Sequence, residues 1–195
     1  MGNTLAQGRE TATKLNEKTD LNLNYFESDL EDAIKWEAID KNDPYSDWSS
    51  KNIARQEKRG MEISINHKLN NNLDLNFSYT YLRAKEDKKD GNGLLKDLNI
   101  VPNTYRVGVS YKDNKLSGDL FMRLGSGASS ESYLDSSYIT VDCAITYNAT
   151  KDLSFYAKGY NLFNEAYAEL AGHNGSSYNY PAQSRRFIVG AEYKF

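Results

Sequence analysis

Apolar and polar residues alternate with a period of two along most of this chain. The clearest example closes the sequence, where Phe187, Val189, Ala191, Tyr193 and Phe195 are separated mainly by charged or small residues. Successive side chains of a β-strand point to opposite faces, so one face of this strand is apolar and the other polar. A lipid-facing strand of an outer-membrane barrel has this pattern, and so does a soluble strand with one buried face.

The same alternation recurs in earlier segments. Leu75, Phe77 and Tyr79, for example, alternate with asparagine and serine. The pattern therefore predicts an all-β, antiparallel fold of eight or nine strands, although Phe121 stands on the polar side of its segment. Strands are expected over residues 21–25, 61–69, 73–81, 105–111, 116–124, 139–147, 153–163 and 187–195, with a weaker one over residues 8–16.

Residues 28–38 allow two interpretations. A helix would bring Leu30, Ile34 and Ala38 onto one face. A strand that continues past the membrane would also fit, provided that a β-bulge shifts its alternation by one residue. We favour the bulged strand.

Short and long connections alternate between the predicted strands. The short ones are rich in Asn and Asp, which favour turns, and comprise residues 70–72, 113–115 and 148–152; the long ones comprise residues 40–52, 85–102, 125–136 and 164–182. An up-and-down outer-membrane barrel has short periplasmic turns and longer external loops. A tilted strand of about ten residues also spans its apolar band of about 25 Å.

The composition supports a membrane barrel over the other broad classes. Mean hydropathy is −0.73 and no segment approaches the roughly 20 apolar residues of a membrane-spanning helix, yet the chain has 15 Tyr and 7 Phe. A barrel with a polar lumen and aromatic residues at the lipid–water boundary reconciles these facts. The net charge of −3 argues against nucleic-acid binding, and Cys143, the only cysteine, permits no internal disulfide.

The strand number bears on whether the chain is complete. A sheet in lipid must be closed, because lipid cannot satisfy an unpaired strand edge. Either eight strands close alone, or residues 1–195 form the C-terminal segment of a larger barrel. The first residues also lack the charged and apolar regions of a signal peptide, so we expect a processed chain or a fragment.

Several short motifs, taken in order, resemble those of TonB-dependent outer-membrane receptors. The most specific is the match of residues 160–167, YNLFNEAY, to the family pattern NLFNxxY. Residues 180–187 resemble YPxPGRxF, although Ser184 replaces the expected glycine and the second proline is absent. Weaker matches are Gly2-Asn3-Thr4-Leu5 followed by Glu10, Arg59-Gly60-Met61-Glu62, Tyr79-Thr80-Tyr81, Val101-Pro102-Asn103 and the terminal aromatic residue.

The resemblance covers nearly the whole chain and implies a specific function. Such receptors are 22-stranded barrels with an N-terminal plug, and they take up ferric siderophores, haem, cobalamin or similar ligands. An inner-membrane TonB-type complex supplies the energy through a short N-terminal box. Neither plug nor box lies in these residues, so we expect only part of the transporter, located in the bacterial outer membrane and in contact with its lipid.

Candidate ligand-binding residues follow from the direction of the side chains. Arg106, Arg123 and Arg186 alternate out of phase with their apolar neighbours and should face the lumen, because a cation on the lipid side costs about 2–4 kcal/mol at mid-membrane. They could guide an anionic ferric chelate. Pairing with lumen acids such as Asp119, Asp142 and Glu192, or with a plug, is the expected alternative. His173, in the last long loop, is a further candidate for ligand contact at the external mouth.

No catalytic or metal-binding cluster is apparent, so we expect neither enzymatic activity nor a bound cofactor or metal. Asn161, Leu162, Phe163 and Tyr167 should shape a strand end and the interface belt. Tyr193 and Phe195 resemble the C-terminal signal that barrel-assembly machinery reads. The alternatives are a small autonomous eight-stranded barrel with a structural or adhesion role, an outer-membrane enzyme, and a soluble β-sandwich.

Overall fold

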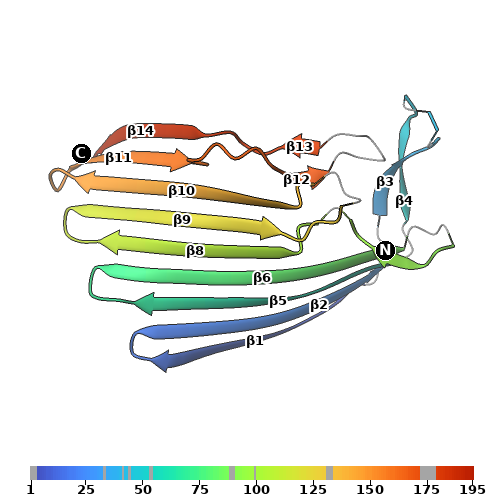
Figure 1. The fold of residues 1–195 in the computed structure, drawn as a ribbon, viewed down its shortest axis with the longest axis horizontal. Coiled ribbons are helices and arrows are strands. Elements are labelled where there is room, and N and C mark those ends of the chain that lie inside the picture. The colour runs from blue at the N-terminus through green and yellow to red at the C-terminus, as the bar shows by residue number, and fades with distance from the viewer. Residues whose placement is uncertain are drawn as a thin grey trace.

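The computed structural model describes residues 4–32, 34–40, 42–43, 45–52, 55–87, 91–98, 100–130, 134–171 and 179–195. These residues form strands, turns and loops, as the period of two predicts (Figure 1). In the described ranges, no helix has the length and apolarity needed to cross a membrane.

One antiparallel sheet contains most of the described residues. Its strands pair with their neighbours in chain order, so the sheet is an up-and-down meander that starts at β1 and ends at β14. The sheet path in the described ranges is β1 (Thr4–Asn16), β2 (Thr19–Glu31), β5 (Arg55–Lys68), β6 (Leu73–Asp87), β8 (Asn103–Lys112), β9 (Leu116–Ser126), β10 (Ser137–Asn148), β11 (Leu153–Tyr160) and β14 (Arg186–Tyr193). The short β7 (Leu94–Lys96) pairs with the end of β6. The prediction of an antiparallel all-β fold is confirmed. The strand that the sequence predicts less clearly, over residues 8–16, is also present as part of β1.

All short turns lie at one end of the sheet, which we call the turn end, and the long connections lie at the other, the loop end (Figure 1). Two small hairpins belong to the long connections. One pairs β3 (Ile34–Ala38) with β4 (Trp48–Asn52), and the other pairs β12 (Ala168–Ala171) with β13 (Asn179–Pro181). The predicted alternation of short and long connections is confirmed.

The bulged strand expected over residues 28–38 is not what forms. The chain leaves the main sheet after Glu31, and Asp32 takes a positive φ of 55°. Asp tolerates this left-handed conformation better than most residues, so it can redirect the chain. Residues 34–38 are extended, but they pair with β4 in a separate hairpin.

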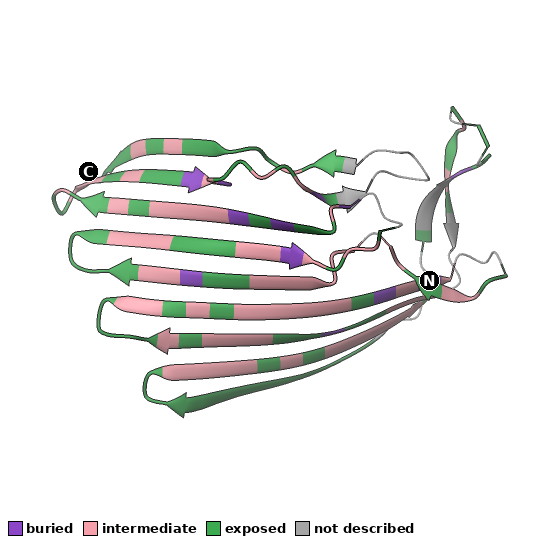
Figure 2. Cartoon of the chain, in the orientation of Figure 1, coloured by how far each residue is buried: buried purple, intermediate pink, exposed green. Residues whose placement is uncertain are grey.

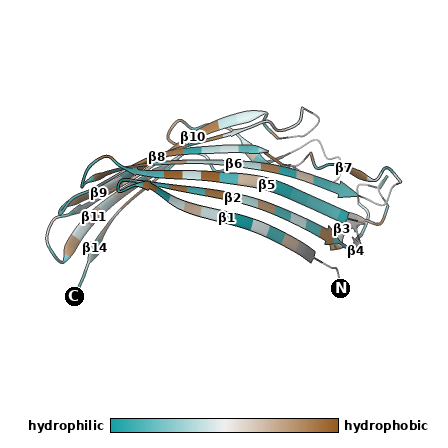
Figure 3. Cartoon of the chain, turned by 90° about the horizontal axis from the view of Figure 1, so that it is seen from below, coloured by the Kyte–Doolittle hydropathy of each residue, from teal (hydrophilic) through white to brown (hydrophobic). Residues whose placement is uncertain are grey.

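The main sheet is a single curved layer in which hydrophobic and hydrophilic residues alternate along the strands (Figure 3). Because successive side chains point to opposite faces, one face is mainly apolar and the other mainly polar. On the apolar face, Phe77, Val107 and Leu120 remain 37%, 41% and 49% exposed, and Val189 is 79% exposed. Few side chains are buried (Figure 2), and in the described residues no large side chain is fully buried. Among the described residues no second protein layer covers the apolar rows, so the described sheet is not half of a β-sandwich.

Aromatic residues border the apolar face at both ends. Toward the loop end, Tyr79 and Tyr105 stack with ring centroids 4.7 Å apart; Tyr25 and Tyr81 belong to the same border. Toward the turn end lie Tyr111, Tyr147, Phe155 and Tyr193. Two aromatic girdles around an apolar band are typical of strands that span a membrane.

Candidate functional site

The polar face of β8, β9 and β14 carries the three predicted arginines. Arg106 lies directly opposite Arg123 in the β8–β9 pair, and Arg186 lies opposite Tyr160 in the β11–β14 pair. Like charges directly opposite each other destabilise a sheet unless other groups compensate them. The surroundings of each arginine therefore decide whether it is available to a ligand.

The positive charge of Arg123 is neutralised by residues of the connection that follows β11. Its guanidinium forms an ion pair of 2.8 Å with Glu169 and donates a hydrogen bond of 2.9 Å to the Tyr167 hydroxyl. It also lies 5.3 Å from the ring centre of Tyr138 and 5.8 Å from that of Tyr167, distances at which cation–π attraction is significant. The two rings stack at 4.3 Å, and the Tyr138 hydroxyl donates to the same Glu169 carboxylate at 2.5 Å. Arg123 thus anchors the connection to the sheet.

Asn161 holds this connection in place. It takes a positive φ of 48° and is only 4% exposed. Its side-chain amide donates to the carbonyls of Glu165 (2.9 Å) and Gln183 (3.1 Å), and its side-chain oxygen accepts from the Glu165 N–H (2.8 Å). Asn161 therefore shapes the strand end, as predicted. Tyr167 does not belong to an interface belt, because it packs on the polar face against Tyr138.

The acids expected to neutralise the arginines have other partners. Asp119 accepts a hydrogen bond from the Ser110 hydroxyl (2.7 Å), and Asp142 accepts one from the Asn161 N–H (2.7 Å). In the described residues, neither these acids nor Glu192 forms an ion pair with an arginine. Glu169 is the acid that the sequence analysis missed. It lies in a long connection, where period-two alternation gives no direction for a side chain.

Arg106 of β8, Lys158 of β11 and Arg186 of β14 are further cations on the polar face. The Arg186 guanidinium lies 4.7 Å from the ring centre of Tyr160, and the Lys158 ammonium lies 5.5 Å from that of Tyr156. Arg106 is exposed and, within the described part of the chain, forms no ion pair or ring contact. Lys158 was not singled out by sequence, because β11 alternates less regularly than its neighbours. Arg106 is the predicted cation best placed to meet an anion.

The other predicted site residues are less constrained. His173 lies outside the described residues, so its contact with ligand stays a prediction. Where residues are described, no group of three or more His, Cys, Asp or Glu side chains could hold a metal ion. Tyr193 and Phe195 form an edge-to-face pair with centroids 5.2 Å apart, and Phe195 is fully exposed.

An antiparallel meander with an uncovered apolar face, a polar face and long connections at one end has the architecture of an outer-membrane β-barrel segment. Residues 6–162 match the family model described as TonB dependent receptor-like, beta-barrel. The chain belongs to this family of bacterial outer-membrane receptors and transporters, which are not enzymes. In outer-membrane barrels the apolar face meets lipid and the longer connections are external.

Relatives and solved structures agree with the family. The chain is 26% identical over 181 residues to the vitamin B12 transporter BtuB of Photobacterium profundum, covering 90% of this chain and 28% of that protein. It is 25% identical over 153 residues to the iron-regulated outer membrane virulence protein of Vibrio cholerae serotype O1, covering 74% and 22%.

The fold matches solved transporters over the whole chain. The copper transporter OprC superposes with a TM-score of 0.77 at 16% identity, and the ferric enterobactin receptor PfeA of Pseudomonas aeruginosa with 0.72 at 17%. Each match covers 100% of this chain and 31% of the structure. The chain thus spans less than a third of the length of all four proteins.

Proposed function

We propose that this chain forms the C-terminal segment of a receptor barrel for the active uptake of scarce ligands of the iron–siderophore, haem or cobalamin type. The observation that carries the proposal is the polar face of β8–β14, which presents Arg106 and Arg186 next to the long connections of the loop end. The connections capture the ligand and the polar face lines its passage. Related proteins described as a vitamin B12 transporter and a ferric enterobactin receptor support this range of ligands.

Arg106 contributes to the passage by attracting anionic ligands. Its charge is exposed, and in the described part of the chain it has no acid partner, whereas Glu169 neutralises Arg123. A lumen walled by low-dielectric protein focuses the field of such a charge and raises the local concentration of anions. His173 is a candidate for contact at the external mouth.

The open edges of the sheet support a barrel larger than this segment. β1 pairs only with β2, and β14 only with β11, within the described residues. Lipid cannot satisfy such edges, so further strands close the barrel. Membership of the TonB-dependent receptor family supports a plug in the full-length receptor. Energy then comes from a TonB-type complex that contacts the N-terminal part, and barrel-assembly machinery reads Tyr193 and Phe195. A small autonomous eight-stranded barrel with a structural or adhesion role is the alternative.

Uptake by cells tests the proposal. Cells with and without the intact full-length protein would be given labelled ferric siderophores, haem or cobalamin, with and without a protonophore. We expect one ligand class to accumulate only with the protein and only in energised cells. Arg106→Gln should lower uptake of an anionic chelate several-fold, whereas Lys151→Gln at the turn end should not. Equal accumulation of every ligand without the protein would favour the autonomous barrel.

A further inference from the structure

We propose that Arg59, Arg83 and Lys85 form a binding site for the phosphate groups of an outer-leaflet lipid headgroup, on the lipid-facing side of β5 and β6. The inference depends on the outer-membrane location of these strands and is independent of the ligand that the receptor carries.

The three cations belong to the same face as the apolar band. Met61 of β5 pairs with Tyr81 of β6 in the aromatic girdle. Two residues closer to the loop end, on the same face, Arg59 pairs with Arg83. Lys85 lies two residues beyond Arg83 on β6. Two residues advance a strand by about 6.6 Å. The cations therefore begin about one such step outside the external aromatic girdle, at the depth of the lipid headgroups.

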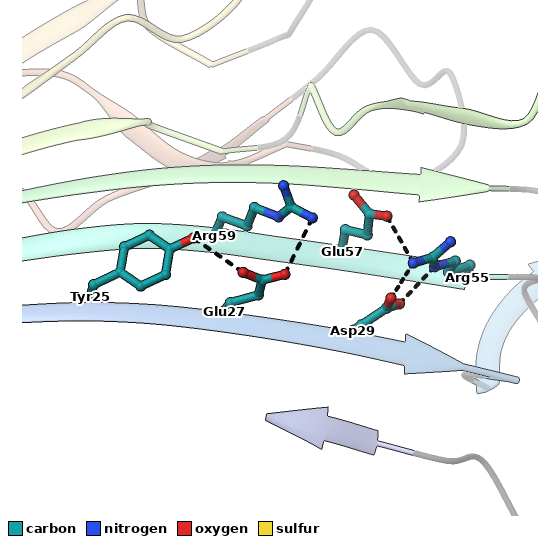
Figure 4. A network of polar contacts seen from close by, with 6 residues as sticks. All are labelled: Tyr25, Glu27, Asp29, Arg55, Glu57 and Arg59. Atoms are coloured by element: carbon teal, nitrogen blue, oxygen red, sulfur yellow. Dashed lines mark hydrogen bonds and ion pairs between the residues drawn. The ribbon is translucent and has the colours of Figure 1, made fainter. Parts of the chain in front are cut away.

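Between β2 and β5, two arginines on this face contact three carboxylates (Figure 4). Arg59 contacts Glu27 at 3.2 Å, and Tyr25 donates a hydrogen bond to the same carboxylate at 3.2 Å. Arg55 donates from Nε to Asp29 at 2.7 Å, makes a second contact to Asp29, and pairs with Glu57 at 3.1 Å. Every arginine that β5 presents here has a carboxylate partner.

Two like-charge pairs occur further along this face. Arg59 of β5 stands directly opposite Arg83 of β6, and Lys85 of β6 has Glu57 on one side but Lys96 of β7 on the other. Such like-charge pairs destabilise a sheet. In the described part of the chain neither Arg83 nor Lys85 forms an ion pair, and Glu57, the acid opposite Lys85, already contacts Arg55. An external anion would relieve this repulsion.

The four side chains Glu57, Arg59, Arg83 and Lys85 line a small pocket of about 50 Å³. Three of them are cations, so the pocket suits an anion and not a metal ion. Guanidinium groups bind phosphate oxygens with two parallel hydrogen bonds, and a lysine adds a point charge. The pocket opens toward lipid, beside Tyr81 and Met61, where a phosphorylated headgroup is the anion held permanently at this depth.

Lipid binding by the full-length protein tests the site. The purified protein in dodecyl maltoside micelles would be titrated with bisphosphorylated lipid A, with dephosphorylated lipid A, and with inorganic phosphate. We expect the bisphosphorylated lipid to bind most tightly. The double variant R83Q/K85Q should weaken its binding about fivefold for each removed charge, equivalent to roughly 1 kcal/mol per cation near an anionic lipid surface.

The double variant K58Q/K151Q is the matched control. It removes the same number of positive charges, but Lys58 points to the polar face and Lys151 lies at the turn end. The affinity of this variant for bisphosphorylated lipid A should therefore match that of the parent protein. Raising the salt concentration should weaken the binding of bisphosphorylated lipid A to the parent protein, because salt screens the attraction between charges. This measurement needs no variant, so it holds even if a substitution impairs folding. Equal losses in both double variants, or equal affinity for the dephosphorylated lipid, would overturn the proposal. Inorganic phosphate that binds as tightly as the lipid would assign the site to free phosphate instead.

Discussion

Phe121 illustrates how the sheet resolves an apparent violation of its pattern. This aromatic residue lies on the polar face, directly opposite Gly108 of β8. A Cβ atom placed on Gly108 would lie 2.6 Å from the Phe121 ring, so the ring covers the glycine. Aromatic residues that cover cross-strand glycines are a known device for fixing register and curvature.

The same pairing recurs across the sheet. An aromatic ring lies over the directly opposite glycine in each of the following pairs: Phe26 with Gly60, Tyr138 with Gly125, Tyr156 with Gly190, and Phe187 with Gly159. The sequence shows the glycines and the rings, but not that they are neighbours, because register joins residues from different strands.

We predict that Gly108→Ala destabilises the barrel by about 1–3 kcal/mol, because the added methyl group forces the Phe121 ring to move. Gly8→Ala is the control, since its Cβ would meet only a carbonyl oxygen at 3.6 Å. The measurement is the free energy of unfolding of the full-length protein in urea and detergent. Equal free energies of unfolding for Gly108→Ala and Gly8→Ala would contradict the proposal that Phe121 packs over Gly108.

At the scale of elements, the short turns were predictable because the Asn and Asp side chains that favour a turn lie within the turn itself. Residues 113–115 were identified by their turn-forming side chains. Asp113 accepts hydrogen bonds from the backbone N–H groups of Leu116 (2.7 Å) and Lys115 (2.8 Å), and from the Tyr111 hydroxyl (2.8 Å). These bonds, led by that from Leu116, lower the pKa of the Asp113 carboxyl below its ordinary value of 3.8.

This shift gives a pH prediction for the β8–β9 turn. Because the folded-state pKa is lowered, the stabilisation by Asp113 is fully present above about pH 4 and is lost as the pH falls through the folded-state value. Asp113→Asn should therefore unfold more easily than the parent protein at pH 7, and the difference should shrink below pH 4. Urea unfolding at a series of pH values measures it. A difference that stays constant down to pH 2 would show that the carboxylate charge is not responsible.

The departure from prediction at residues 28–38 has a different origin. Extended structure was expected and occurs, yet a strand pattern alone does not say which strand is the partner. Asp32 redirects the chain, and β3 finds β4 instead of extending the main sheet.

For the whole molecule, the open sheet is the decisive feature. We predict that residues 1–195, exported alone, do not form a heat-modifiable, protease-resistant barrel, because the edges of β1 and β14 have no partner in the described structure. The full-length protein should do so. Band shifts of unboiled samples in gel electrophoresis measure the difference. A heat-modifiable monomer of the isolated residues would identify an autonomous barrel.

The sequence by itself determined the strands of the main sheet path, the direction of their side chains and the order of short and long connections, because period-two alternation and turn chemistry are local properties. It also placed Arg106, Arg123 and Arg186 on the polar face correctly. It did not predict the short strands β4, β7, β12 and β13 within the long connections. Only the tertiary structure decided which groups meet. Arg123 pairs with Glu169 and not with a neighbouring strand acid, since the connection after β11 folds back over the sheet. Arg59 and Arg83 come together because the register of β5 and β6 aligns them.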